Sequence, residues 1–347
     1  MIALIADLCE PLAPAELDRR VRLLSEHAPI ISARRDGDWW VRGEPPVVTT
    51  SSDDAGSGLG ARFALDLEPP LRLRLSDSHR TLVIEGHHAA FDGLGLATVV
   101  TALTSETPEV GRVPDEPVAR PPTSERGSAA ITVEGRTEGS DSSLWSRLLR
   151  PAPRVAASCP PPRHESFVAQ DVAIDRGGAF TARLTRACVD AAIARNRSYD
   201  IRMSRVGISL GLGGSRTIGN TASYRRVDLD LRSKTDIAEV VRNAIADERE
   251  PAELRFAPSA ARLLARPVAS WFSDSLLVSN LGIVDAPGVR RLQFFPVARG
   301  RSAVAFGAAS LARGRATLTL RARDLDRDDA LQLLGMVSER LTSPGDA

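Results

Sequence analysis

The sequence is poor in several residue types, and each scarcity narrows what the chain can be. Lysine occurs only at Lys234, and 45 basic against 44 acidic residues leave a net charge of +1. This balance gives no support to a nucleic-acid partner. The three cysteines, Cys9, Cys159 and Cys188, cannot all pair and show no metal-ligand spacing. We therefore expect a protein of a reducing compartment that needs no disulfide framework.

Long hydrophobic runs are also missing. No stretch approaches the roughly 18 consecutive apolar residues of a membrane-spanning helix. The apolar run over residues 1–8 is short, lacks a basic flank and is interrupted by Asp7, so it does not resemble a secretory signal. We therefore expect a cytoplasmic protein without a membrane span.

The composition that remains is that of a globular protein. Of 347 residues, 43% are hydrophobic and 26% charged, which is ordinary for a folded domain. The length fits one large domain or two of about 150 residues each. Residues 105–163 are rich in Pro, Ser, Gly and Arg and predict a linker that crosses between a subdomain at 1–104 and a second at 164–347. The small polar residues of 47–60 predict a loop.

Hydrophobic periodicity predicts a mixture of strands and helices in both halves. Leu71-Arg72-Leu73-Arg74-Leu75 alternates strictly, as in a strand with one exposed face, whereas Leu17, Val21 and Leu24 repeat at helical spacing. The other predicted strands are 2–8, 30–34, 39–42, 81–85, 167–174, 205–212, 224–231, 276–279, 291–295, 303–311 and 316–323. The other predicted helices are 94–103, 180–195, 237–245, 260–264 and 328–341, and short pieces at 129–133 and 144–149 look structured. The fold class expected is α/β, with a mixed sheet and covering helices in each half.

One segment carries candidate chemistry. Between a predicted strand and a predicted helix, His87 and His88 are followed by Asp92 and Gly93. A neutral imidazole can accept a proton at physiological pH, so either histidine is a candidate base. Asp92 could fix the loop backbone or pair with a distant arginine; in the simpler interpretation, the segment is a surface loop and Asp92 caps the helix. Adjacent histidines rarely ligate one ion together, so we expect no metal site.

The spacing resembles a known signature. His-His-x-x-x-Asp-Gly at 87–93 is the motif of the chloramphenicol acetyltransferase-like superfamily, which includes condensation domains, polyketide-associated acyltransferases and wax ester synthases. Residues 63–66, 216–220 and 278–282 resemble the family's flanking segments and occur in the usual order. The chain is roughly a fifth shorter than common members and lacks the Asp-Phe-Gly-Trp-Gly segment of the plant alcohol acyltransferases, which argues against that branch.

The resemblance implies roles for the motif residues. The fold would be two acetyltransferase-like subdomains with an active-site tunnel between them. His88 would be the general base that takes a proton from a hydroxyl or amine as it attacks a thioester, without an acyl-enzyme. His87 would be structural, and Asp92 would hold the loop through a salt bridge to Arg216. No cysteine sits beside a histidine in the sequence, which fits such direct transfer.

The resemblance also assigns residues around the expected tunnel. Gly93 would permit close backbone packing beside it. Ser279 and Asn280 would line it near the oxyanion; an equally good interpretation places them in a turn between strands. The glycine-rich segment 211–215 lacks the spacing of a phosphate-binding loop and is interpreted as a hairpin turn or a tunnel wall.

The function implied is acyl transfer from a coenzyme A or carrier-protein thioester to a hydroxyl or amine of a small-molecule acceptor, most simply in secondary metabolism. The thioester would be a consumed donor, and no bound cofactor is expected. Two alternatives remain open. One is a free-standing condensation-type enzyme that forms an amide or a ring on carrier-bound substrates. The other is a non-catalytic relative that recruits an acyl or peptidyl carrier protein.

Overall fold

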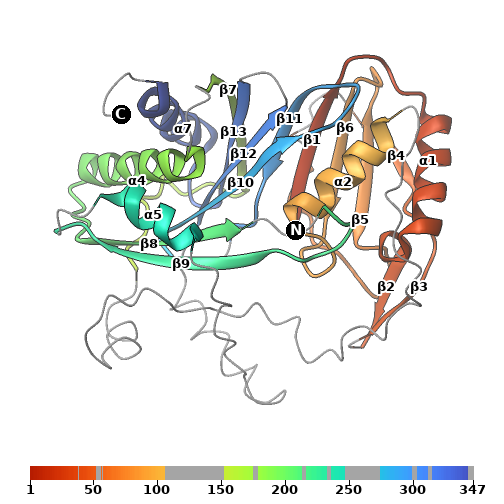
Figure 1. Ribbon diagram of the computed structural model, residues 1–347, viewed down its shortest axis with the longest axis horizontal. Helices are drawn as coiled ribbons and strands as arrows, with labels where there is room; N and C mark the ends of the chain where they lie inside the picture. Colours follow the sequence, from red (N-terminus) through yellow and green to blue (C-terminus); the bar gives the residue numbers. More distant parts are fainter. Residues whose placement is uncertain are drawn as a thin grey trace.

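The computed structural model describes residues 1–37, 39–51, 56, 58–105, 152–174, 179–212, 216–232, 236–246, 274–298, 303–311 and 315–342. These residues form two large sheets with covering helices, placed side by side in Figure 1, and a separate two-stranded hairpin. The α/β class expected from the periodicity is confirmed. The predicted pieces at 129–133, 144–149 and 260–264 lie outside the described residues.

The first sheet has five strands. In order across the sheet they are β11 (Val289–Phe295), β1 (Ile2–Leu8), β6 (Thr81–Gly86), β5 (Leu71–Ser76) and β4 (Val48–Ser51). Helices α1 (Pro14–His27) and α2 (Gly93–Thr104) cover one face (Figure 1). The alternation predicted for β5 is confirmed, because Leu71, Leu73 and Leu75 are buried.

Two strands of this sheet depart from the sequence-based expectations. β4 lies within the segment predicted as a loop, and it pairs in parallel with β5 from Val48 to Ser51. Its polar residues form a strand because backbone hydrogen bonds to a neighbour suffice at a sheet edge. β11 comes from the C-terminal half and pairs antiparallel with β1. The first sheet therefore draws on both halves of the chain, across the predicted division at 104 and 164.

The second sheet has six strands from the C-terminal half. In order they are β7 (Ser166–Ala173), β13 (Arg315–Ala322), β12 (Val304–Leu311), β10 (Leu276–Val284), β8 (Arg205–Leu212) and β9 (Ser223–Asp230). β10 runs parallel to both neighbours, and the other pairs are antiparallel. The covering helices are α4 (Phe180–Ser198), α5 (Ile237–Ala246) and α7 (Arg327–Thr342). Their apolar faces and the sheet form one continuous core.

Smaller elements complete the described chain. A short helical turn, η1 (Pro29–Ser32), replaces most of the strand predicted at 30–34, because Pro29 at its start favours a helical turn. It precedes a hairpin of β2 (Ala33–Asp36) and β3 (Trp39–Arg42). Residues 152–158, inside the predicted linker, pack on the C-terminal half, where the Asn196 side chain bonds the backbone of Ala156 and Arg154 at 2.7 and 2.8 Å. No helix in the described ranges is long and apolar enough to cross a membrane.

The two sheets meet along β11, which lies against β12 and β13. Phe295 of β11 is buried with Ala3, Ile5 and Val83 of the first sheet, and Phe167 of β7 packs against them. The aromatic rings of Phe167 and Phe295 meet edge to face, with centroids 5.4 Å apart. This junction fixes the end of β6, and hence the motif that follows it, relative to the second sheet.

Candidate active site

The His-His-x-x-x-Asp-Gly motif forms a tight turn between β6 and α2. The carbonyl of His87 accepts hydrogen bonds from the backbone N–H groups of Ala90 at 2.9 Å and Phe91 at 3.1 Å. The N–H of His87 itself donates to the carbonyl of Pro70 at 2.8 Å. Because the turn is bonded internally and to the segment before β5, the two histidines are held on a rigid scaffold.

The ring of His88 is oriented by contacts at both nitrogens. Its Nδ1 lies 3.0 Å from the carbonyl oxygen of Phe91, and its Nε2 lies 2.7 Å from the hydroxyl oxygen of Tyr224. A carbonyl oxygen only accepts, so the contact requires a proton on Nδ1. In the neutral ring, the lone pair is therefore on Nε2, and the Tyr224 hydroxyl donates to it. His88 thus presents Nε2 as the basic atom, as a general base requires.

Asp92 is buried, with 1% exposure, and its carboxylate is bound by neutral groups. One oxygen accepts from the N–H of Gly95 at 2.7 Å, which makes Asp92 the N-cap of α2. The other accepts from the N–H and the hydroxyl of Thr221 at 2.7 and 3.2 Å. The helix N-terminus also stabilises its negative charge.

The expected salt bridge from Asp92 to Arg216 is wrong. The Arg216 side chain is exposed and donates instead to the carbonyl of Ile283 at 3.3 Å. The burial of Asp92 explains the difference, because backbone N–H groups can bind a buried carboxylate without bringing a second charge out of water. The helix-cap interpretation is confirmed, and the carboxylate makes no hydrogen bond to His88 within the described part of the chain.

A segment of the C-terminal half, residues 216–224, clamps the motif from the other side. Gly219 accepts the N–H of Asp92 at 3.0 Å, and the Asn220 side chain donates to the carbonyl of His88 at 2.6 Å. A Cβ added to Gly95 would collide with the carbonyl oxygen of Gly219, so only glycine allows this approach. The clamp holds the motif at the boundary of the two subdomains.

The other predicted site residues lie nearby. His87 accepts the N–H of Ala89 through Nδ1 at 3.1 Å and packs against the Phe63 ring, whose centroid is 5.8 Å away. A Cβ on Gly93 would lie 2.6 Å from Leu281 Cδ2 and 2.8 Å from Phe294 Cζ, so the close packing expected at Gly93 is present.

Ser279 and Asn280 lie within β10 rather than in a turn. They line a cavity of about 20 Å³ together with Asp92, Gly93 and Tyr224. The Asn280 amide is tied to the Thr181 hydroxyl at 3.0 Å and to the N–H of Gly282 at 2.9 Å. The cavity holds about one water molecule and is too small for a thioester and an acceptor. A continuous tunnel between the subdomains stays a prediction.

Glu85, just before the motif, is not among the residues that line this cavity. It is 2% exposed, and burial raises the pKa of its carboxyl. Its carboxylate oxygens lie 3.6 Å from Arg74 Nη2 and 3.4 Å from the N–H of Gly60. Because these contacts hold the Glu85 carboxylate against Arg74 and Gly60, we assign Glu85 to the packing of β6 rather than to proton transfer at His88.

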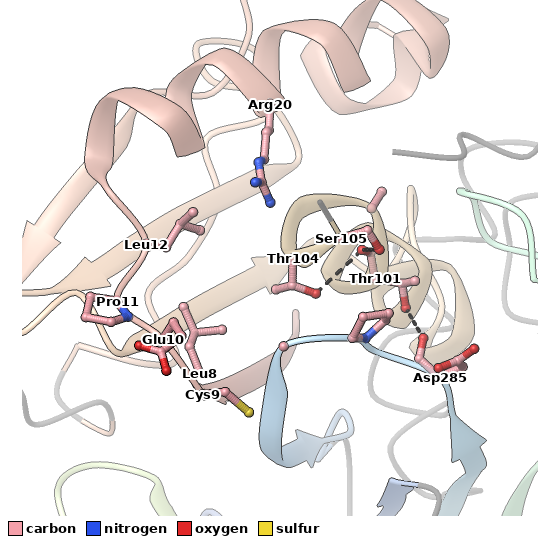
Figure 2. A pocket seen from close by; sticks show the side chains of 13 residues that line it. Leu8, Cys9, Glu10, Pro11, Leu12, Arg20, Thr101, Thr104, Ser105 and Asp285 are labelled. Carbon is pink, nitrogen blue, oxygen red and sulfur yellow. Dashed lines mark hydrogen bonds between the residues drawn. The ribbon is translucent and has the colours of Figure 1, made fainter. Parts of the chain in front are cut away.

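A larger pocket lies at the far end of α2. It measures about 700 Å³ and is lined by the C-terminal turn of the helix, by residues 8–12 and by the loop after β10. In Figure 2, Thr104 at the helix end lies across from Pro11 and Leu12 with Arg20 above them, and Thr101 is turned toward Asp285. The pocket contains neither histidine of the motif. Within the described ranges, no group of three or more His, Cys, Asp or Glu side chains could hold a metal ion.

Comparison with known proteins finds similar folds among solved structures but no similar sequences. No family model matches the chain, and no curated protein matches it in sequence. Its fold is nevertheless shared with solved structures. The first condensation domain of the CDA synthetase has a TM-score of 0.61 and 13% identity, over 100% of this chain and 92% of that chain.

Two further structures are similar. The starter condensation domain of rhizomide synthetase, a mutant in complex with C8-CoA and Leu-SNAC, has a TM-score of 0.58 at 13% identity, over 100% of this chain and 89% of that one. The epimerization domain from the third module of tyrocidine synthetase B has a TM-score of 0.55 at 13% identity, over 98% and 90%. The chain therefore has the condensation-domain fold, the two-subdomain chloramphenicol acetyltransferase-like fold that its motif predicted.

Sequence reasoning missed Tyr224 and Thr221. Neither belongs to the motif, and both are more than 120 positions from it, so only the tertiary structure brings them to His88 and Asp92. One signal was available: the chain has only 2 tyrosines, and Tyr224 begins a strand soon after the family-like segment at 216–220.

Proposed function

We propose that the protein is a condensation-type acyltransferase that moves an acyl group from a thioester to a hydroxyl or amine of a small-molecule acceptor. The observation that carries the proposal is the geometry of His88, whose Nδ1–H is bound to the Phe91 carbonyl so that Nε2 is the basic atom. The condensation-domain fold supports the proposal, because one solved structure with this fold, the starter condensation domain of rhizomide synthetase, is a complex with C8-CoA.

In the proposed reaction, His88 Nε2 takes the proton of the acceptor group as that group attacks the thioester carbonyl. The tetrahedral intermediate collapses, the carbon–sulfur bond breaks, and the proton on His88 passes to the departing thiolate. Both carboxylate oxygens of Asp92 are already bound by Gly95 and Thr221, so Asp92 anchors the loop and the start of α2. Ser279 and Asn280 lie across the small cavity, where they could face the oxyanion.

The donor is a thioester of coenzyme A or of a carrier protein. The cavity of about 20 Å³ is too small for these substrates, so it must widen when they bind. The same small volume supports one second candidate, a non-catalytic protein that docks a carrier protein without opening. The two differ in a single measurable property, which is turnover that depends on His88.

The test compares wild type with His88→Ala. Acetyl-CoA, C8-CoA and an acylated carrier protein serve as donors, Leu-SNAC or hydroxylamine as acceptor, and thiol release and product mass are followed. A sole general base contributes about 10²- to 10⁴-fold, so His88→Ala is expected to lose that factor. His164→Ala, which removes an exposed histidine, is the matched control and retains full turnover. A folded His88→Ala with wild-type turnover contradicts the proposal, and carrier binding without turnover in either protein supports the docking alternative.

A further inference from the structure

The hydroxyl of Tyr224 occupies the position from which a substrate would approach His88. It lies 2.7 Å from Nε2, the atom that must accept the proton. The two rings meet edge to face, with centroids 5.7 Å apart. A base whose lone pair is already bound by a phenol cannot also receive a proton directly from the acceptor. Either the phenol leaves, or the proton passes through it.

The residues that line the cavity show that Tyr224, and not His88, is exposed to it. Tyr224 lines the cavity together with Ser279 and Asn280, whereas His88 does not line it. A group held against Ser279 and Asn280 therefore meets Tyr224 before it meets the imidazole. Tyr224 connects the space available to substrate with the base.

Tyr224 is also held in place. It lies in β9, where it pairs with Gly211 of β8, and its side chain packs against Leu277, Ala298 and Ala305. Moving the ring away would break the bond to His88 and disturb this packing. Passing a proton requires neither, because a hydroxyl can accept one proton while it donates another.

We propose that Tyr224 is a catalytic residue that relays the proton from the acceptor to His88, an inference that rests on the proposed function. As the acceptor O–H or N–H attacks the thioester carbon, its proton passes to the Tyr224 oxygen, and the phenolic proton passes to His88 Nε2. The new carbon–oxygen or carbon–nitrogen bond forms while the carbonyl electron pair moves to oxygen. On collapse, the thiolate leaves and regains a proton along the same path, which restores neutral His88 and the phenol.

The test is Tyr224→Phe, which keeps the ring and its packing but removes the relay oxygen. With C8-CoA and Leu-SNAC, kcat is expected to fall by about 10- to 100-fold, within the range of acid–base catalysis, while KM stays near the wild-type value. Tyr199→Phe, at the only other tyrosine, is the matched control and keeps both parameters. In mixtures of H₂O and D₂O, the wild-type rate plotted against deuterium content is expected to lie below the straight line that joins pure H₂O and pure D₂O. This shape is expected when more than one proton moves in a single step.

Each outcome has a distinct meaning. If Tyr224→Phe equals or exceeds wild type while His88→Ala is inactive, the relay is wrong and the tyrosine is a displaceable cover. If wild type turns over no faster than His88→Ala, the proposed function fails and the relay with it. A rise in KM at unchanged kcat overturns the relay in favour of a binding role.

Discussion

The two ends of α2 differ in a way that shows where chemistry can reside. At its N-terminus, buried polar groups are bound to one another around a cavity of about 20 Å³. At its C-terminus, a pocket of about 700 Å³ is open, and ordinary helix-end contacts such as Thr101 Oγ1 to the Asp285 carbonyl at 2.7 Å line it (Figure 2). The 12-residue helix separates the ends by about 18 Å.

The larger pocket and the candidate catalytic groups therefore lie at opposite ends of α2. The lining of the open end offers space but no histidine, whereas the closed end holds an imidazole of defined tautomer beside a buried carboxylate. The closed end is also where the two subdomains touch, through the clamp at residues 216–224. Changes there are expected to alter both stability and turnover, whereas equivalent changes at the open end are expected to alter stability much less and turnover not at all.

The largest effect in this comparison is expected for Asp92→Asn. An amide can accept from Gly95 or from Thr221, but its NH₂ group then faces the other N–H donor. Leaving a buried donor unpaired, and losing charge-assisted bonds, costs about 2–3 kcal/mol in the free energy of unfolding. Urea denaturation measures this change.

The matched control for that change is Asp285→Asn at the open end. Asp285 is exposed, and only its backbone carbonyl bonds Thr101, so its stability is expected to change by no more than about 0.5 kcal/mol. Equal losses for the two variants would remove the distinction between the ends of the helix.

A smaller effect is expected for Gly95→Ala. The added Cβ would meet the carbonyl of Gly219, and displacing that backbone costs about 1–3 kcal/mol, partly offset by the better helix propensity of alanine. Gly335→Ala in α7 is the control, because nothing lies within 4 Å of its Cβ position, and there the same change is expected to be neutral or stabilising. Thermal unfolding of both variants is compared; a stabilised Gly95→Ala would show that the clamp is not tight.

The smallest effect is expected for Arg20→Ala at the open end. Arg20 donates to the carbonyl of Leu103 at 2.8 Å and to Glu16 at 2.6 Å. Arg19 and then Arg20 hold the pKa of Glu16 at about 2, so the variant is expected to raise that pKa toward 4.5 without reaching it.

The sign of the pH dependence follows from that pKa. A lowered carboxyl pKa stabilises the fold above pH 4.5, and this stabilisation is lost as the pH falls toward about 2. Because Arg20→Ala raises the pKa of Glu16, the pH range over which the stabilisation is lost becomes narrower. NMR titration of Glu16 measures the shift, and turnover is expected to stay at the wild-type level. A loss of turnover would place the open pocket in the reaction.

The sequence predicted the local features of the fold better than the non-local ones. The alternation at Leu71–Leu75 and the helical repeat after Pro14 are set by burial of neighbouring side chains, and both elements formed as expected. β4 was missed because its residues are polar and only its backbone pairing makes it a strand. The place of β11 in the first sheet depends on pairing across the length of the chain, which no local pattern contains.

The site shows the same division. The motif located His88 and Asp92, and the helix cap was foreseen from local chemistry. The predicted partner of Asp92 was wrong: the resemblance implied a salt bridge to Arg216, whereas the buried carboxylate binds the uncharged groups of Thr221. Tyr224 has no motif of its own, and only its distance from His88 identifies it.

The tautomer of the His88 ring decides whether Nε2 can act as a base. In ¹⁵N-labelled protein, the signals of His88 are assigned among the 5 histidines by their loss in His88→Ala. We expect the neutral ring to carry its proton on Nδ1, bonded to the Phe91 carbonyl, with a lone pair on Nε2. A neutral ring protonated on Nε2 would turn its lone pair toward that carbonyl and would contradict the account.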